Sequence, residues 1–390
     1  MALTRREFLE GGIGTISVIG FSLVKIPGLE QIARAAELET VAEIPVVWMA
    51  TGACSGCSVA LLNSASPTIQ ELLLDKVLPG KHLSLGFHAT VMAASGEQAM
   101  EALNEVRRNH KGAYVLVVDG ATATKDDGLY CGVGEIDGRM ITGYEHVRDL
   151  SRDAAAVLAV GACAAFGGIP AAEPNPTGAV SVAELFQRED IRTPLVKIPG
   201  CPPHPDWIVG TIATLLLAGL DALELDELGR PAPFFSQCIH DNCPFRGHFE
   251  RGEFAEHFGE HGCLIKLGCK GPITYADCPI RKFNNGTSWC CEAGHPCIGC
   301  CHQDFPFDQS LFTPVQPAQL DFSAMYPPTD QSEARKGIDT TTYGTVGLIG
   351  AGGFLAGVGV MAAARKLKSK KGEPAPSDHG DGKERADEAR

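Results

Sequence analysis

The chain has 390 residues, of which 44% are hydrophobic and 15 are cysteines, and its formal net charge is −14. This length and apolar content can bury a sizeable core, which argues against a short scaffold held together only by disulfides. The acidic balance argues against a nucleic-acid partner, because affinity for a phosphate backbone comes from basic surfaces.

The N-terminus predicts an export signal. The run Thr4-Arg5-Arg6-Glu7-Phe8-Leu9 precedes a Gly-rich apolar stretch, which is the pattern of a twin-arginine signal. Ala33-Arg34-Ala35 then offers a small-x-small cleavage site, so residues 1–36 are interpreted as a signal peptide and excluded from the fold. Because the twin-arginine route carries folded proteins, the signal indicates a cofactor inserted before export.

Residues 37–230 predict an α/β domain. Apolar runs such as 114–118 fit strands that are covered on both faces, which favours a parallel sheet with helices on both sides. The amphipathic segments Pro67–Leu78 and Gly96–His110 are predicted helices. The predicted strands are Ile44–Ala50, His82–His88, Ala113–Asp119, Ala156–Val160 and Leu195–Ile198.

Four cysteines follow these predicted strands. Cys54 and Cys57 come after the first strand, Cys163 after the fourth and Cys201 after the fifth. Ligands of such sheets gather outside the carboxyl ends of the strands, so the four thiols are expected to converge on one site.

Residues 231–314 form a second region, which is rich in Cys, Gly, His and Pro. Ten of the 15 cysteines lie between Cys238 and Cys301, a density that favours iron–sulfur clusters. Disulfides and zinc are the alternatives. The odd number of cysteines, the spacing Cys297-x-x-Cys300 and the spacing His240-x-x-Cys243 suit metal better than disulfides. Such a segment lacks the apolar pattern of a core, so ligated metal is expected to organise it.

The C-terminal part predicts a membrane anchor. Residues 315–342 are interpreted as a linker, and residues 343–364 run without a charge for long enough to cross a bilayer as a helix. The basic residues that follow are typical of a cytoplasmic flank, so residues 365–390 are a predicted cytoplasmic tail. The body of the protein would then lie on the periplasmic face of the membrane.

Six motifs in order resemble the small subunit of membrane-bound periplasmic [NiFe] hydrogenases, over nearly the whole chain. Single C-x-x-C pairs are far less specific than this ordered set. The motifs are Cys54-Ser55-Gly56-Cys57, Gly161-Ala162-Cys163-Ala164-Ala165-Phe166-Gly167-Gly168, Pro199-Gly200-Cys201-Pro202-Pro203-His204-Pro205, His240-Asp241-Asn242-Cys243-Pro244, Leu267-Gly268-Cys269-Lys270-Gly271-Pro272 and Ala293-Gly294-His295-Pro296-Cys297-Ile298-Gly299-Cys300.

The resemblance implies a flavodoxin-like first domain and three iron–sulfur clusters. It implies a proximal [4Fe–4S] cluster facing a catalytic partner, with ligands Cys54, Cys57, Cys163 and Cys201. It implies a distal [4Fe–4S] cluster held by His240, Cys243, Cys263 and Cys269. It implies a medial cluster held by Cys278, Cys297 and Cys300, which in the common form of the family is [3Fe–4S].

The chain departs from the common pattern of the family at two places. Cys290 stands where many relatives have proline, so a fourth thiolate is available and a medial [4Fe–4S] cluster is the hypothesis. The stretch Val59-x-Leu61-Leu62-Asn63 lacks the acidic residue that many members carry. Both features are similar to the selenium-containing branch. Cys131, Cys238, Cys291 and Cys301 have no role in the resemblance and are interpreted as buried structural thiols.

The resemblance implies an electron-transfer function, in which electrons from H2, oxidised at a Ni–Fe site in a separate large subunit, pass to a membrane acceptor such as an integral membrane cytochrome b. No catalytic residue is assigned to this chain, which is expected to act in an obligate heterodimer. One rival is the single-cluster subunit of respiratory NADH dehydrogenases, which shares the flavodoxin-like part but lacks the region from His240 to Cys300. The other rival is a zinc-organised surface protein.

Overall fold

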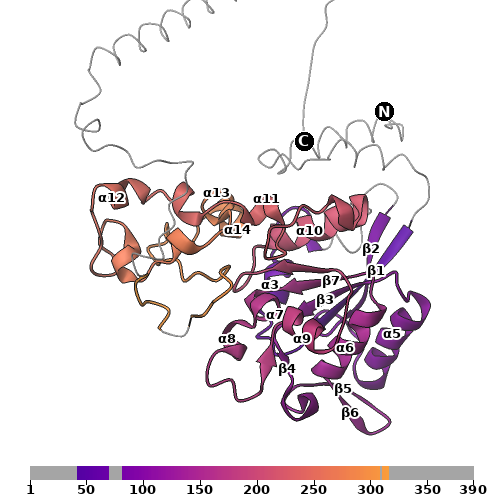
Figure 1. Cartoon of the computed structure of the whole chain (residues 1–390). Coiled ribbons are helices and arrows are strands. Elements are labelled where there is room, and N and C mark those ends of the chain that lie inside the picture. The colour runs from indigo at the N-terminus through magenta and orange to yellow at the C-terminus, as the bar shows by residue number, and fades with distance from the viewer. Residues whose placement is uncertain (1–41, 70–80, 308–309, 316–390) are drawn as a thin grey trace, which may run out of the picture. The chain divides into compact units, whose positions relative to one another are not determined.

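The computed structural model describes residues 42–69, 81–307 and 310–315 (Figure 1). The predicted signal peptide, membrane segment and cytoplasmic tail lie outside the described residues, as does most of the predicted helix Pro67–Leu78. Within the described part of the chain, no helix is long and apolar enough to cross a membrane.

A five-stranded parallel sheet organises the first region. Its strand order is β2-β1-β3-β7-β9, and every neighbouring pair is parallel. Numbered among themselves, these strands have the order 2-1-3-4-5, which is the flavodoxin-like order. The five predicted strands and the parallel sheet are therefore confirmed. The observed strands are β1 (Ala42–Ala50), β2 (Lys81–His88), β3 (Val115–Asp119), β7 (Ala156–Val160) and β9 (Leu195–Ile198).

Shorter strands and the helices connect this sheet. The predicted helix Gly96–His110 is observed as α5 (Gly96–Asn109). Two small antiparallel sheets pair β4 (Thr122–Ala123) with β8 (Ala179–Val180), and β5 (Gly132–Ile136) with β6 (Arg139–Thr142). The remaining helices of this region are α3 (Gly56–Leu62), η1 (Lys125–Gly128), α6 (Gly143–Asp153), α7 (Ala162–Phe166), α8 (Gly168–Ala171), α9 (Val182–Arg188), α10 (Pro205–Ala218) and η2 (Leu220–Ala222).

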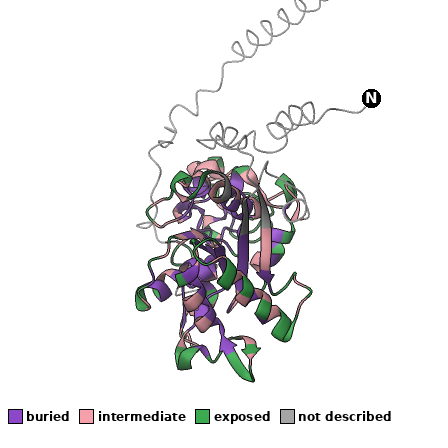
Figure 2. Ribbon diagram, turned by 90° about the vertical axis from the view of Figure 1, so that its right-hand side faces the viewer, coloured by how far each residue is buried: buried purple, intermediate pink, exposed green. Residues whose placement is uncertain are grey.

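Alternate residues of the strands enter two separate hydrophobic cores, because successive side chains of a strand point to opposite faces. Trp48 and Val117 pack with α3 and α10 on one face, whereas Met49 and Val118 pack with α5, α6, α7 and α9 on the other. Figure 2 shows the buried residues concentrated in the strands and in the helix faces against them. The continuous apolar runs in the sequence are explained by this double coverage.

Local signals fix the starts of two long helices. Thr142 and Glu145 form a capping box at α6, in which each side chain bonds the backbone N–H of the other residue. His204 precedes α10 and its Nδ1 accepts from the backbone N–H of Asp206, while Pro205 occupies the first turn, where its missing N–H costs nothing.

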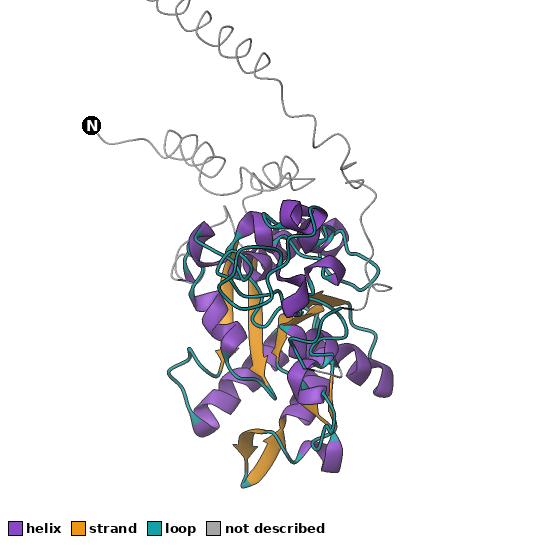
Figure 3. Ribbon diagram, turned by 90° about the vertical axis from the view of Figure 1, so that its left-hand side faces the viewer, coloured by secondary structure: helices purple, strands orange, loops and turns teal. Residues whose placement is uncertain are grey.

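The cysteine-rich region consists of short helical turns joined by loops, as Figure 3 shows. It packs on the α10 face of the sheet, since Phe235, Ile239, Leu264 and Trp289 belong to the same hydrophobic cluster as Trp48 and Val117. Its elements are α11 (Ala232–Phe235), η3 (Ile239–Asn242), α12 (Arg246–Glu250), η4 (Leu264–Leu267), η5 (Gly271–Ile273), α13 (Cys278–Arg281) and α14 (Phe283–Gly286).

Candidate functional site

The four predicted proximal cysteines come together at the carboxyl edge of the sheet. Cys54 and Cys57 lie before and within α3, Cys163 lies in α7 after β7, and Cys201 follows β9. Partial burial and the negative charge of Cys54 together raise the pKa of the Cys163 thiol to about 11, and partial burial with the charges of Cys300, Cys163 and Cys54 raises that of Cys201 to about 12. Thiolates this close repel one another, so the deprotonated forms of this group would be stabilised by bound metal cations.

Glycines leave room around the proximal thiols. Gly161 has a φ of +91°, and a Cβ there would lie 2.5 Å from Cys57 Sγ. A Cβ at Gly56 would lie 3.2 Å from Cys54 Sγ. The glycines in these motifs therefore permit a close approach that any other residue would obstruct.

A buried carboxylate lies beside this group and was not singled out from the sequence. Asp119 ends β3, is 2% exposed, and accepts a hydrogen bond from Ser58 Oγ at 3.1 Å. Burial raises its pKa, while the hydrogen bond from Ser58 opposes the shift. Its position at the carboxyl end of a central parallel strand was the available signal.

The four predicted distal ligands line a single pocket. His240 lies in η3, Cys243 follows η3, Cys263 precedes η4, and Cys269 follows η4. The His240 ring is 7% exposed and meets the edge of Phe249 with ring centroids 4.7 Å apart. One imidazole and three thiols thus face one space, which fits an iron–sulfur cluster with mixed ligands. His248 is not among the lining residues and pairs with Glu253 at 2.6 Å.

Cys291 lies in the same pocket, although the resemblance gave it no role. Its Sγ is 3.9 Å from Cys269 Sγ, and its proximity also lowers the pKa of the Cys243 thiol. The hydrogen bond with Cys291 lowers the pKa of the Cys269 thiol to about 7, against the effect of burial. The spacing of the cysteines did not predict this contact, because Cys290 and Cys291 are adjacent and spacing alone does not tell which of the two enters which pocket.

Cys290 lies with the predicted medial cysteines. Burial raises its pKa to about 11, and the charges of Cys300 and Cys278 raise it further. The pKa of Cys297 is likewise raised by burial and by the charges of Cys300 and Cys278, and its sulfur accepts the Gly299 backbone N–H at 3.4 Å. Four thiols therefore surround the medial position, as the hypothesis for Cys290 requires.

The three groups are adjacent to one another in a fixed order. Besides burial, the negative charge of Cys300 raises the pKa of Cys201, so the proximal group lies beside the medial group. The charge of Cys269 raises the pKa of Cys297, and Lys270 N donates to Cys297 O at 2.7 Å, which joins the medial group to the distal one. The medial group thus stands between the other two.

The thiol arrangement suits clusters better than zinc. In the described ranges, no group of three or more His, Cys, Asp or Glu side chains is placed to hold a single metal ion. A structural zinc ion needs four donors at about 2.0–2.3 Å. A four-iron cluster is a larger body, so its ligands stand further apart around it.

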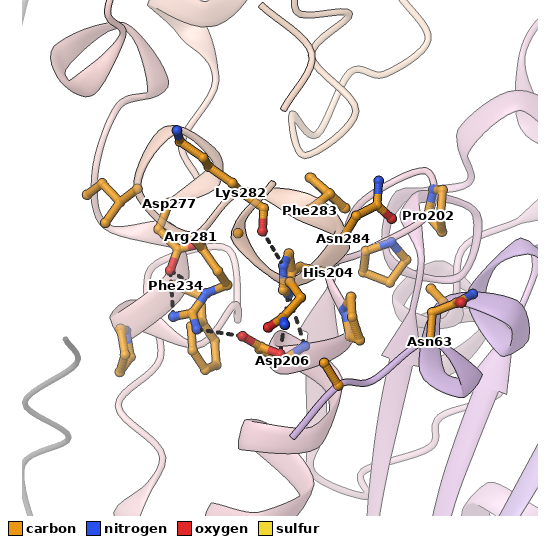
Figure 4. Close-up of a pocket in the computed structure, with 18 of the residues that line it drawn as sticks. Asn63, Pro202, His204, Asp206, Phe234, Asp277, Arg281, Lys282, Phe283 and Asn284 are labelled. Carbon is orange, nitrogen blue, oxygen red and sulfur yellow. Dashed lines mark hydrogen bonds and ion pairs between the residues drawn. The ribbon is translucent and has the colours of Figure 1, made fainter. Parts of the chain in front are cut away.

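An open groove of about 880 Å³ lies between α3, the segment that starts α10, and residues 277–286 (Figure 4). His204 Nε2 lies 2.8 Å from Lys282 O, and Arg281 bonds Asp206 and Asp277 at 3.0 and 2.8 Å. No cysteine is among the described residues that line this groove. The ion pairs of Arg281 with Asp206 and Asp277 join the two regions at this groove.

Two family models match different parts of the chain. Residues 54–215 match the model of the NADH ubiquinone oxidoreductase 20 kDa subunit, and residues 235–313 match the model for the C-terminal region of the NiFe/NiFeSe hydrogenase small subunit. The first match covers the part that both rival families share. The second covers the cysteine-rich region and so decides between them.

Curated relatives and solved structures agree. The periplasmic [NiFeSe] hydrogenase small subunit of Desulfomicrobium baculatum is 44% identical over 80% of this chain and 99% of its own length. The quinone-reactive Ni/Fe-hydrogenase small chain of Wolinella succinogenes is 38% identical over 79% of this chain and 84% of its own. The crystal structure of a reduced, active Ni-Fe-Se hydrogenase from D. baculatum matches with a TM-score of 0.66 and 45% identity, over 70% of this chain and 100% of that one.

Proposed function

The chain belongs to the family of NiFe and NiFeSe hydrogenase small subunits, and we propose that it conducts electrons through three iron–sulfur clusters. H2 would be oxidised at a Ni–Fe site in a partner large subunit. The electrons would leave through this chain to a membrane acceptor. No residue of this chain is assigned a role in breaking the H–H bond.

The single observation that carries the proposal is the order of the three ligand groups. Cys201 lies near enough to Cys300 for their charges to interact, and Cys297 lies near Cys269 in the same way, so a route runs from the proximal group through the medial group to the distal group. Iron–sulfur clusters bound there would supply reversible one-electron redox chemistry. The protein's own contribution is to hold the ligands, keep water away from the buried thiols and keep neighbouring groups close.

The ligand assignment follows from this order. The proximal [4Fe–4S] ligands would be Cys54, Cys57, Cys163 and Cys201. The distal [4Fe–4S] ligands would be His240, Cys243, Cys263 and Cys269. The medial ligands would be Cys278, Cys290, Cys297 and Cys300, and the proximity of Cys290 to Cys278 and Cys300 supports a medial [4Fe–4S] cluster over [3Fe–4S].

The surface around the proximal thiols supports a partner subunit there. Cys54 and Cys201 are exposed in this chain. Two apolar side chains nearby are also exposed: Val59 of α3, at 51%, and Ile169 of α8, at 54%. Exposed apolar side chains that surround a functional group are typical of a protein–protein interface. The large subunit would cover this face, so that electrons enter where Cys54 and Cys201 now meet solvent.

The acceptor and the location are part of the same proposal. A twin-arginine signal in residues 1–36 would send the folded, cluster-loaded protein to the periplasm, and residues 343–364 would anchor it in the membrane. One relative is named quinone-reactive, which supports a membrane acceptor such as an integral membrane cytochrome b. Deletion of residues 343–390 should release the complex from washed membranes and leave H2 oxidation with an artificial dye intact.

The test of function compares the isolated chain with the heterodimer. The isolated, loaded chain should contain about 12 iron atoms with matching acid-labile sulfide, and it should not take up H2. The heterodimer should reduce a dye with H2. A colourless protein with zinc and no sulfide, or H2 uptake by the isolated chain, would overturn the proposal.

A further inference from the structure

The distal pocket holds one sulfur more than a cluster needs. Its lining includes His240, Cys243, Cys263 and Cys269, which supply four donors, and it also includes Cys291. Cys291 is 2% exposed, so its thiol is buried with the predicted ligands and not directed to solvent. A fourth sulfur, and thus a fifth possible donor, in this pocket requires an explanation other than ligation.

The contacts of Cys291 differ from those of Cys238, the other unassigned thiol beside the distal pocket. Cys238 donates to the backbone oxygens of Gly271 and Pro272 at 3.3 and 3.4 Å. The Cys291 Sγ instead lies 3.9 Å from Cys269 Sγ, within hydrogen-bonding distance for two sulfur atoms. Cys291 is therefore in contact with a predicted ligand sulfur, whereas Cys238 is directed at carbonyl oxygens.

A buried thiol beside a thiolate is a hydrogen-bond donor. A ligand thiolate carries no proton, so in a sulfur–sulfur pair with such a ligand only the other cysteine can donate, and its S–H is a weak donor. A donor to a ligand sulfur withdraws electron density from it and stabilises the more negative, reduced cluster. Hydrogen bonds to the sulfurs are among the factors that set the potential of an iron–sulfur cluster.

We propose that Cys291 donates a hydrogen bond to the Cys269 sulfur and thereby raises the reduction potential of the distal cluster. The inference rests on the proposed function, because it requires a distal cluster held by His240, Cys243, Cys263 and Cys269. Cys291 is a positioning residue here, acting on the cluster through Cys269. A higher reduction potential at the distal cluster favours electron transfer from the medial cluster to it over transfer in the opposite direction.

The test uses the holoenzyme heterodimer with Cys291→Val, Cys291→Ser and the control Cys238→Val. Cys238 is also 2% exposed and bonds residues that line the same pocket, so it matches Cys291 in burial and location. Electron paramagnetic resonance during a redox titration gives the potentials, and the nitrogen coupling of His240 identifies the distal signal.

The expected result is a lower distal potential in Cys291→Val, with the proximal and medial potentials unchanged. Cys291→Ser should stay closer to the wild type, because its hydroxyl can still donate. Cys238→Val should shift none of the three potentials. An unchanged distal potential in Cys291→Val would overturn the proposal. The proposal would also fail if Cys291→Ser kept the distal cluster but lost the His240 coupling, because residue 291 would then be a ligand in place of His240.

A measurement on the wild type keeps the test independent of variant folding. In deuterated buffer, electron–nuclear double resonance should detect an exchangeable deuteron coupled to the distal cluster. A nitrogen-coupled distal signal without such a deuteron overturns the role of Cys291 and leaves the proposed function standing. The absence of any nitrogen-coupled cluster overturns the ligand assignment itself, so the two failures are distinguishable.

Discussion

The two regions of this molecule are stabilised by different means. The α/β region, residues 42–230, buries apolar side chains on both faces of a five-stranded sheet. The region from residue 231 to 315 has helical turns of only three to five residues each, and many of its buried side chains are cysteines. The comparison teaches that one region can fold by burying apolar surface, whereas the other is expected to need ligation to fix its backbone.

The regions nevertheless share one core. Trp207 Nε1 of α10 donates to Asp277 Oδ1 at 2.7 Å, and Trp207 packs against Phe235 with ring centroids 4.9 Å apart. Arg230 donates to Cys301 O at 3.1 Å. The change in composition near residue 230 therefore marks a change in how the chain is held together, while the packing continues across it.

The largest expected effect is loss of structure in one region only. Removing iron and sulfide from the isolated chain should abolish amide protection throughout residues 235–313 and leave it in β1, β3 and β7, because only the first region buries two apolar cores. Hydrogen exchange with mass spectrometry measures this. Cys263→Ala should produce part of the same loss, and Cys131→Ala, which removes an unassigned thiol of the α/β region, should not. Equal protection in both regions of the iron-free chain would contradict the comparison.

A second change tests ligation inside the cysteine-rich region. Cys290→Pro should convert a medial [4Fe–4S] cluster to [3Fe–4S], because it removes one of four thiols around that position. The oxidised wild type should lack the [3Fe–4S] spin signal, and the variant should display it. Cys238→Ala is the control, since its thiol donates to the backbone oxygens of Gly271 and Pro272 and no ligand role is proposed for it. A strong [3Fe–4S] signal already present in the wild type would refute ligation by Cys290.

The contact between the regions can be weakened without touching a ligand. Trp207→Phe removes the hydrogen bond to buried Asp277 and leaves a small cavity, which together should cost roughly 2–4 kcal/mol. Tyr114→Phe removes a hydroxyl bonded to Leu150 O inside the α/β region and should cost about 1 kcal/mol. Denaturant unfolding of the loaded chain measures both. Only Trp207→Phe should also speed the loss of the clusters, and equal rates in the two variants would argue against a shared core.

The smallest expected effect is a pH dependence of the α/β region. Burial lowers the pKa of His88 to about 4, against about 6.5 in an unfolded chain. The unfolded state then binds more protons as the pH falls, so this contribution is complete above about pH 6.5 and is lost toward pH 4. His88→Gln should flatten the fall in stability by about 1–2 kcal/mol over that range. Exposed His257 gives the control variant His257→Gln, which should leave the curve unchanged.

The sequence by itself determined the α/β fold and the ligand candidates. Apolar runs long enough for strands, set between amphipathic segments, predicted each strand of the parallel sheet, because a strand covered on both faces must be apolar at every position. The resemblance of the ordered motifs to a known family implied twelve candidate ligands, of which Cys263, Cys278 and Cys290 lie outside the motifs themselves. Those signals involve residues that are close together in the sequence, so they can be recognised without a structure.

Only the tertiary structure decided what lies beside those ligands. Cys291 follows Cys290 directly, but Cys290 lies with the medial thiols while Cys291 enters the distal pocket. Asp119 reaches Ser58 and Cys57 across 61 and 62 positions of the sequence. Neither contact follows from spacing, because the direction of a side chain in an irregular loop is set by distant segments that pack against it. In a region without helical or strand periodicity, neighbouring residues have no repeat that predicts which way each one points.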